Sequence, residues 1–149
     1  MVLTITLPTE YSYVLAVASS SFLLGTYHYI LTAVARGKAK VPYPVAYASK
    51  EEADKDPAVF KFNCAQRAQS NFVENHSGWL GALLISGLRF PVASAGLGAV
   101  WVVARVLYGQ GYTSKKGPKG RILGSSLASL TDLSLRVMAV YTTVSMVLA

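Results

Sequence analysis

The chain has 149 residues, of which 52% are apolar and 14% are charged. Soluble globular chains carry about 25% charged residues, so this composition argues against an ordinary soluble domain. The length predicts a single domain, residues 1–149, and the formal net charge of +7 raises the question of a nucleic-acid partner.

The first predicted element is a membrane-spanning helix over residues 11–35. This segment contains no Asp, Glu, Lys or Arg over 25 residues, and roughly 20 apolar residues suffice for a helix to cross a bilayer. It lacks the basic start of a cleaved signal peptide, because Glu10 stands immediately before it. We therefore expect a retained transmembrane helix.

Three further helices are predicted at residues 58–88, 92–112 and 121–148. The charged run Lys50–Asp56 is predicted to be a solvated loop, since its alternating signs and flanking prolines suit no buried element. The connection Arg89–Pro91 is so short that the helices on either side must form an antiparallel hairpin. The predicted fold is therefore all-α, an integral membrane four-helix bundle with up-down topology.

The distribution of basic residues favours membrane orientation over nucleic-acid binding. Ten of the 14 Lys and Arg residues fall in or beside the first and third connections, and only Arg89 falls in the second. This is the positive-inside pattern, which places both basic connections in the cytosol and both termini in the lumen. We expect no nucleic-acid partner.

A stripe of polar side chains marks the second predicted helix. It consists of Asn63, Arg67, Asn71 and Glu74. Their spacing of i, i+4, i+8 and i+11 puts all four on one face of a helix. Ionisable groups on a helix that enters a bilayer are costly unless a polar partner meets them. The stripe therefore predicts a binding site.

The third predicted helix carries a similar face, which consists of Trp101, Arg105, Tyr108 and Tyr112. An aromatic belt at the membrane interface would explain Tyr112. It explains Arg105 and Tyr108 less well. These two residues would put a charged guanidinium next to a phenol inside the membrane rather than at its surface. We expect these two residues to face a ligand.

The fourth predicted helix begins at Arg121, where the guanidinium and the positive helix end together favour an anion such as a thiolate or carboxylate. The alternative is an arginine that merely reaches the membrane interface. Further along, Asp132 and Arg136 are spaced i, i+4 and are interpreted as a structural ion pair.

Two other residue types are expected to lie outside the chemistry. His28 and His76 have no partners at metal-ligand spacing, so we expect no metal site. The single Cys64 is interpreted as a packed apolar residue. Because one small bundle cannot shield all the polar groups of these helices, we also expect a homo-oligomer.

Three blocks of the sequence resemble one known family. They are Phe62–Glu74 (FNCAQRAQSNFVE), Ala104–Tyr112 (ARVLYGQGY) and the turn Val41–Pro44 (VPYP). In this order and spacing, over nearly its whole length, the chain resembles the membrane-associated proteins of eicosanoid and glutathione metabolism (the MAPEG superfamily). The branch that it resembles most is that of the type 3 microsomal glutathione S-transferases, followed by leukotriene C synthase.

This resemblance implies a homotrimer of four-helix subunits that binds glutathione between neighbours, on the cytosolic side. By matching position, Arg121 would stabilise the glutathione thiolate and Arg36 would bind a carboxylate. The other glutathione ligands implied by the resemblance are Arg67, Gln69, Asn71, Glu74, Tyr108 and Tyr112. The charge of Arg105 would neutralise a further carboxylate, and that of Glu74 would pair with the ammonium.

Two positions depart from the pattern of leukotriene C synthase. Asn75 stands where that enzyme has a tyrosine, and Gly37 replaces the second of its paired arginines. These departures argue against leukotriene synthesis as the main activity.

The predicted function is that of a membrane glutathione S-transferase with peroxidase activity, in which glutathione is the co-substrate. A nearby cation and helix start lower the pKa of a thiol by roughly 1 to 5 units from about 8.5. The thiolate would then attack a lipophilic electrophile or a lipid hydroperoxide. Either substrate would reach the site from the bilayer, so membrane lipid is an expected partner. The alternatives are a leukotriene C synthase-like enzyme, a non-enzymatic lipid-binding scaffold and a small transporter or channel subunit. The expected location is the endoplasmic reticulum membrane, with the outer mitochondrial membrane as the alternative.

Overall fold

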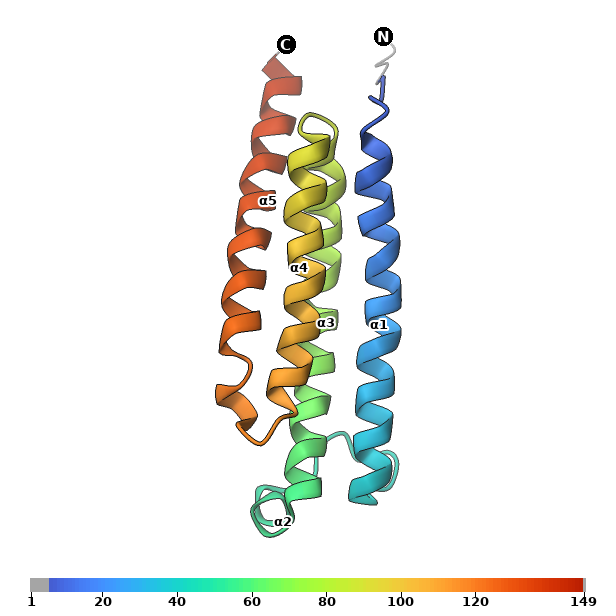
Figure 1. The fold of residues 1–149 in the computed structure, drawn as a ribbon, viewed down its shortest axis with the longest axis vertical. Helices are drawn as coiled ribbons and strands as arrows, with labels where there is room; N and C mark the ends of the chain where they lie inside the picture. The colour runs from blue at the N-terminus through green and yellow to red at the C-terminus, as the bar shows by residue number, and fades with distance from the viewer. Residues whose placement is uncertain (1–5, 149) are drawn as a thin grey trace.

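The computed structural model describes residues 6–148, and every regular element in that range is helical. The elements are α1 (Tyr11–Ala39), α2 (Lys50–Lys55), α3 (Pro57–Gly87), α4 (Pro91–Tyr112), the 3-10 helix η1 (Gly117–Lys119) and α5 (Ile122–Leu148). The all-α prediction is confirmed. The long helices α1, α3, α4 and α5 alternate in direction, so α1 begins at the end of the molecule where α5 finishes (Figure 1).

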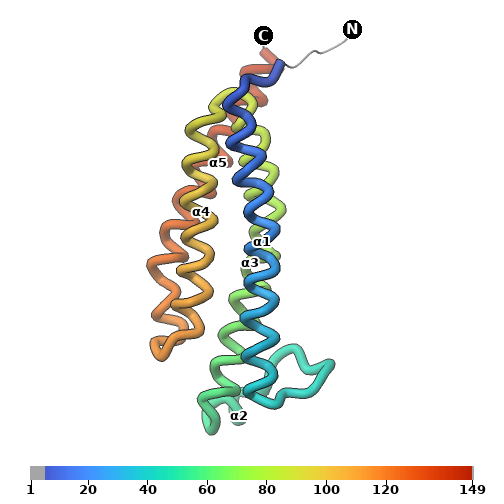
Figure 2. Tube along the Cα trace, turned by 45° about the vertical axis from the view of Figure 1, so that its right-hand side comes forward, coloured from blue at the N-terminus to red at the C-terminus, as the bar shows by residue number. Residues whose placement is uncertain are grey.

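The four long helices pack as two antiparallel pairs. Helix α1 lies along α3 and α5 lies along α4, while α3 and α4 also contact each other (Figure 2). The two pairs meet closely at the end where α1 begins and diverge toward the end that carries α2 (Figure 2). The starts of α3 and α5 and the last turns of α4 belong to this diverging half.

Two of the described helices, α1 and α4, are long and apolar enough to cross a membrane. Helices α3 and α5 have comparable lengths, but the same measure of length and composition does not select them. Polar residues interrupt both, namely the stripe on α3 and the Asp132–Arg136 pair on α5. That all four helices span a bilayer stays a prediction.

The middle of the bundle is held by stacked aromatic rings from α3 and α4. Trp79 and Trp101 are almost completely buried, and their rings stack with centroids 4.1 Å apart. Phe72 joins them, 6.1 Å from the ring of Trp101. Large aromatic side chains contribute most of the buried apolar area in such contacts. This aromatic cluster therefore holds α3 against α4.

The run Lys50–Asp56 is not the loop that its composition predicts. Residues Lys50–Lys55 form α2, whose start is closed by a reciprocal capping box between Ser49 and Glu52. An exposed pair of Glu51 and Lys55, with Nζ and Oε1 2.6 Å apart, adds support one turn later. The segment is solvated as expected, but local hydrogen bonds make it helical.

Ser49→Ala is expected to unfold α2 without disturbing the long helices. The Ser49 hydroxyl and backbone N–H both donate to the Glu52 carboxylate and hold the pKa of that carboxyl below its ordinary value of 4.5. This stabilisation is present above pH 4.5 and is lost as the pH falls through the lower value. Limited proteolysis within residues 50–56 should become faster in the variant at neutral pH, whereas Ser134→Ala, on α5, should leave that rate unchanged.

Helices α4 and α5 approach closely at Gly124. A Cβ atom at this position would lie 2.6 Å from the Ala104 carbonyl oxygen and 2.7 Å from the Tyr108 Cα atom. Gly124→Ala is therefore expected to push the helices apart and to destabilise the protein by about 1–3 kcal/mol. Thermal unfolding in detergent measures this loss. Gly81→Ala is the control, because its Cβ would meet nothing within 4 Å, and a stability equal to that of Gly124→Ala would contradict the close approach.

Candidate functional site

A cavity of about 320 Å³ lies between α3, α4 and the first turns of α5. We call it the polar cavity, and the residues that define it are Arg67, Asn71, Arg105, Tyr108, Arg121 and Asp132. Its volume falls at the lower end of the range of about 300–1,000 Å³ that is usual for small-ligand sites. Five of these six residues belong to the predicted glutathione set, and they come from α3, α4 and the turn before α5.

Arg121 lines the polar cavity and stands immediately before α5. Its Nη1 atom donates to the Tyr108 hydroxyl at 3.2 Å, and its guanidinium lies 4.9 Å from the centre of the Tyr112 ring. The two tyrosine rings meet edge to face, 5.6 Å apart. The hydrogen bond to Tyr108 raises the pKa of Arg121 above its ordinary value, so the guanidinium stays charged. A fixed cation therefore stands at a helix start, as the thiolate hypothesis requires.

Arg105 is the deeply buried cation of the site, with only 3% of its surface exposed. Its Nη1 atom donates to the Asn71 side-chain oxygen at 2.9 Å, whereas Nε and Nη2 are buried without a partner. The guanidinium also lies 4.6 Å from the centre of the Tyr108 ring. A buried cation with unused donors is costly. An anion bound in the polar cavity beside Arg105 would offset part of this cost through charge attraction.

The polar stripe on α3 does not act as one unit. Arg67 donates to both carboxylate oxygens of Glu74, at 2.7 Å and 3.3 Å, and both side chains are about half exposed. Arg67 lines the polar cavity and Glu74 does not. Asn63 bonds through both side-chain atoms to the backbone of Ala48, at 3.0 Å each. Asn63 therefore ties the segment before α2 to α3 and does not line the polar cavity.

Arg36 and Gln69 line a different cavity, of about 210 Å³, between α1 and α3. The Arg36 guanidinium lies between the rings of Tyr43 and Phe62, 4.4 Å and 4.5 Å from their centres, and Nη1 donates to the Val45 carbonyl at 2.8 Å. Gln69 follows Arg67 by two residues, which turns its side chain to the other side of α3. Within one chain, five of the predicted glutathione ligands line the polar cavity and two line this second cavity, while Glu74 and Tyr112 line neither.

Asp132 also lines the polar cavity, although the sequence predicts only a structural ion pair for it. Its pairing with Arg136 is observed, with Arg136 Nε and Asp132 Oδ2 2.9 Å apart. Its other oxygen, Oδ1, is buried without a partner. A signal was available in the sequence, because Asp132 follows Arg121 by eleven residues. In the predicted helix 121–148 that spacing is about three turns, so both residues would lie on the same face.

The histidines and the cysteine pack in the interior. His28 and His76 both lie against the Phe72 ring, with centroids 5.0 Å apart in each case. The hydroxyl oxygen of Ser21 is 2.8 Å from His76 Nε2. Cys64 is also buried, which agrees with its interpretation as a packed apolar residue. These side chains stabilise the contacts of α1 and α3.

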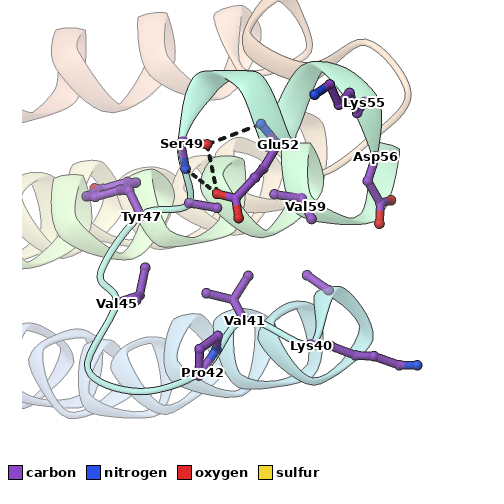
Figure 3. A pocket seen from close by; sticks show the side chains of 12 residues that line it. Lys40, Val41, Pro42, Val45, Tyr47, Ser49, Glu52, Lys55, Asp56 and Val59 are labelled. Atoms are coloured by element: carbon purple, nitrogen blue, oxygen red, sulfur yellow. Dashed lines mark hydrogen bonds between the residues drawn. The ribbon is translucent and has the colours of Figure 1, made fainter.

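The largest of the cavities described here, about 460 Å³, lies beside α2. Figure 3 shows that Val41, Val45 and Val59 contribute apolar side chains to it, while Lys40 and Lys55 point away. Both of its acidic residues are engaged in helix caps, Glu52 with Ser49 and Asp56 with the Ala58 backbone N–H. We therefore place the candidate site in the polar cavity, which three arginines line.

The fold combines two helices that are long and apolar enough to cross a membrane with a polar cavity that three arginines line. The profile of the MAPEG family matches residues 14–141, and the chain belongs to this family. The chain is also 32% identical over 120 residues to an uncharacterized protein of Synechocystis sp. (strain ATCC 27184 / PCC 6803 / Kazusa), a match that covers 78% of this chain and 80% of that protein. The family resemblance is thus confirmed, and it supports a glutathione-related or eicosanoid-type membrane function in general.

Proposed function

We propose that the protein is a membrane glutathione S-transferase with peroxidase activity, of the type 3 microsomal branch. The observation that carries this proposal is the buried guanidinium of Arg105, a residue that lines the polar cavity and has two nitrogen atoms without a hydrogen-bond partner. Arg67 and Arg121 line the same cavity. Three cations suit a small ligand that carries two carboxylates and an ionised thiol, which is the charge pattern of glutathione.

Each of the cavity residues has a role in this proposal. Arg105 and Arg67 bind the two carboxylates, and Asn71 holds the Arg105 side chain in place through the bond at 2.9 Å. Arg121 faces the sulfur and favours its thiolate form, with Tyr108 and Tyr112 fixing the guanidinium. Glu74 holds the Arg67 guanidinium in place through their ion pair. No metal takes part in this chemistry.

The thiolate acts as the nucleophile in two reactions. With a lipophilic electrophile, the sulfur forms a bond to carbon while the leaving group departs with its electron pair. With a lipid hydroperoxide, the sulfur attacks the terminal oxygen, which yields the lipid alcohol and the sulfenic acid of glutathione. A second glutathione then forms the disulfide and releases water. In both reactions Arg121 stabilises the negative charge on sulfur before attack.

A homotrimer would complete the site. Arg36 and Gln69 cannot share a ligand with Arg121 in the same chain, because they line a cavity on the other side of α3. In a ring of three chains, this second cavity of one subunit would face the polar cavity of the next. Exposed apolar residues on α1 and α5, such as Phe22, Leu23 and Leu130, would contact lipid or the neighbouring subunits. In this proposal the site lies on the cytosolic face of the endoplasmic reticulum membrane, and the positive charge of the two connections supports the cytosolic side.

Calorimetric titration with glutathione in detergent tests the proposed function. We expect saturable binding to the purified protein, together with formation of a thioether when a lipophilic electrophile is added. A Lys119→Ala variant serves as the control, because Lys119 is exposed and lies outside the polar cavity. The absence of glutathione binding would contradict the proposal and leave a lipid-binding scaffold as the better interpretation.

A further inference from the structure

A small cavity with two lysines lies between the end of α1 and the start of α3, apart from the polar cavity. Its volume is about 110 Å³. Four of its residues are apolar and two are basic, namely Leu31, Val34, Ala35, Ala58, Lys38 and Lys61. We call it the lysine groove. Because Val34 is 52% exposed, the groove lies at the surface of the chain.

The lysine groove crosses the boundary at which the charge-free part of α1 ends. Its apolar residues on α1 belong to the segment 11–35, and Lys38 follows Ala35 by three residues. Helix α3 begins beside the end of α1 (Figure 1), and Lys61 lies in its second turn. Cα–Cβ bonds tilt toward the N-terminus of their own helix. Lys38 therefore leans back toward the apolar segment and Lys61 leans toward the polar end, so the two side chains converge.

Within residues 6–148, no ion pair involves Lys38 or Lys61. Asp56 is the acid nearest to Lys61 along the chain, and it is engaged in the cap of α3, where Oδ1 accepts from the Ala58 N–H at 2.7 Å. Two like charges that line so small a groove repel each other. An anion bound between the two lysines would turn this repulsion into attraction.

We propose that the lysine groove binds an anionic phospholipid of the surrounding membrane. The phosphate lies between Lys38 and Lys61, and the upper part of an acyl chain contacts the apolar residues. A phospholipid carries its phosphate and its acyl chains in the same order in which the groove presents lysines and apolar side chains. A free phosphate ion would leave the apolar residues unused, and a zwitterionic lipid would leave the two positive charges without a net countercharge.

This inference goes beyond the proposed function and does not depend on glutathione. No residue of the lysine groove lines the polar cavity. The inference requires that α1 crosses a membrane, for which α1 is long and apolar enough. Anionic lipids attract basic residues next to a membrane-spanning helix, by about a factor of five in affinity for each lysine.

The test is a titration of the purified full-length chain in detergent, followed by thermal unfolding. The probes are dioleoyl phosphatidylglycerol, which is anionic, and dioleoyl phosphatidylcholine, which has the same acyl chains and no net charge. The anionic lipid should raise the unfolding temperature of the wild-type protein at lower concentrations than the zwitterionic lipid. Lys38→Gln/Lys61→Gln should bind the anionic lipid about 30-fold more weakly.

Two controls separate a lipid site from simpler attractions. Lys115→Gln/Lys116→Gln removes the same charge at exposed positions outside the groove, so it should bind the anionic lipid as the wild-type protein does. The soluble headgroup glycerophosphoglycerol should not change the unfolding temperature at the same concentrations, because it lacks the acyl chains.

Three results would overturn the inference. An equal loss of affinity in both double variants would show a general attraction to the basic end of the protein. A soluble headgroup as effective as the lipid would show a phosphate site without a lipid. If Lys38→Gln/Lys61→Gln does not fold, the single variants Lys38→Gln and Lys61→Gln are measured, and unchanged affinity in both contradicts the site.

Discussion

Arg105→Met is expected to stabilise the ligand-free protein and to abolish tight binding of glutathione. The guanidinium is buried with two unused nitrogen atoms, and replacing such a charge by an apolar side chain of similar length is often neutral or stabilising by about 1–4 kcal/mol. Removing it from a ligand carboxylate should cost about 2–5 kcal/mol, which is roughly 30- to several thousand-fold in the dissociation constant. Thermal unfolding in detergent, with and without glutathione, measures both effects.

Lys119→Met is the matched control for this variant. Lys119 is an exposed basic residue outside the polar cavity, so its replacement should leave the glutathione-dependent gain in unfolding temperature intact. A normal gain in Arg105→Met would show that Arg105 has a structural role only. Loss of the gain together with lower stability of the free protein would show that the cavity collapses without the cation.

Arg121→Ala is expected to slow conjugation at neutral pH by about 10- to 100-fold while weakening glutathione binding much less. Without the cation, the pKa of the bound thiol should return toward about 8.5, which leaves only about 3% thiolate at pH 7. Because a raised thiol pKa is overcome by raising the pH, the variant should regain rate between about pH 7 and 9. The pH profile of kcat and the ultraviolet absorbance of the bound thiolate both measure the change.

Tyr108→Phe separates the cation from its hydrogen bond. This variant keeps Arg121 charged but removes the 3.2 Å bond from its guanidinium, so its profile should fall between those of the wild-type protein and Arg121→Ala. An unchanged pH profile in Arg121→Ala would remove Arg121 from the chemistry and leave it as an arginine of the membrane interface.

The residue types of the site were predictable from the sequence because helical spacing is a local property. The positions of Arg67 and Asn71 on α3, and of Arg105 and Tyr108 on α4, follow from a repeat of 3.6 residues. That Arg105 meets Asn71 does not follow from this repeat, because the two residues are 34 apart in the chain. Their contact depends on how α3 packs against α4, which the turn between them only partly determines.

Sequence patterns could not predict which of these residues line the same cavity. Glu74 was expected to receive the ligand ammonium, yet in the ligand-free protein it is held by Arg67, seven residues away. Which partner a flexible ionised side chain chooses depends on the local packing rather than on spacing. Arg36 and Gln69 likewise face away from the polar cavity, a separation that only the arrangement of α1 beside α3 reveals.

The prediction of a loop at residues 50–56 was wrong because it relied on composition alone. The run beginning at Lys50 has the charges of a solvated loop, but Ser49 and Glu52 carry the S-x-x-E signature of a capping box. Two reciprocal hydrogen bonds at the start outweigh the low apolar content of the segment, because an exposed helix of six residues needs no buried face when its ends are satisfied.

A structure of the protein with glutathione bound tests the central claim most directly. We expect the ligand in the polar cavity of each subunit, with its sulfur beside the Arg121 guanidinium, a carboxylate on Arg105, and Arg36 of a neighbouring chain completing the site. An empty polar cavity, with glutathione bound beside α2 or nowhere on the protein, would contradict the assignment of this chain as a glutathione transferase.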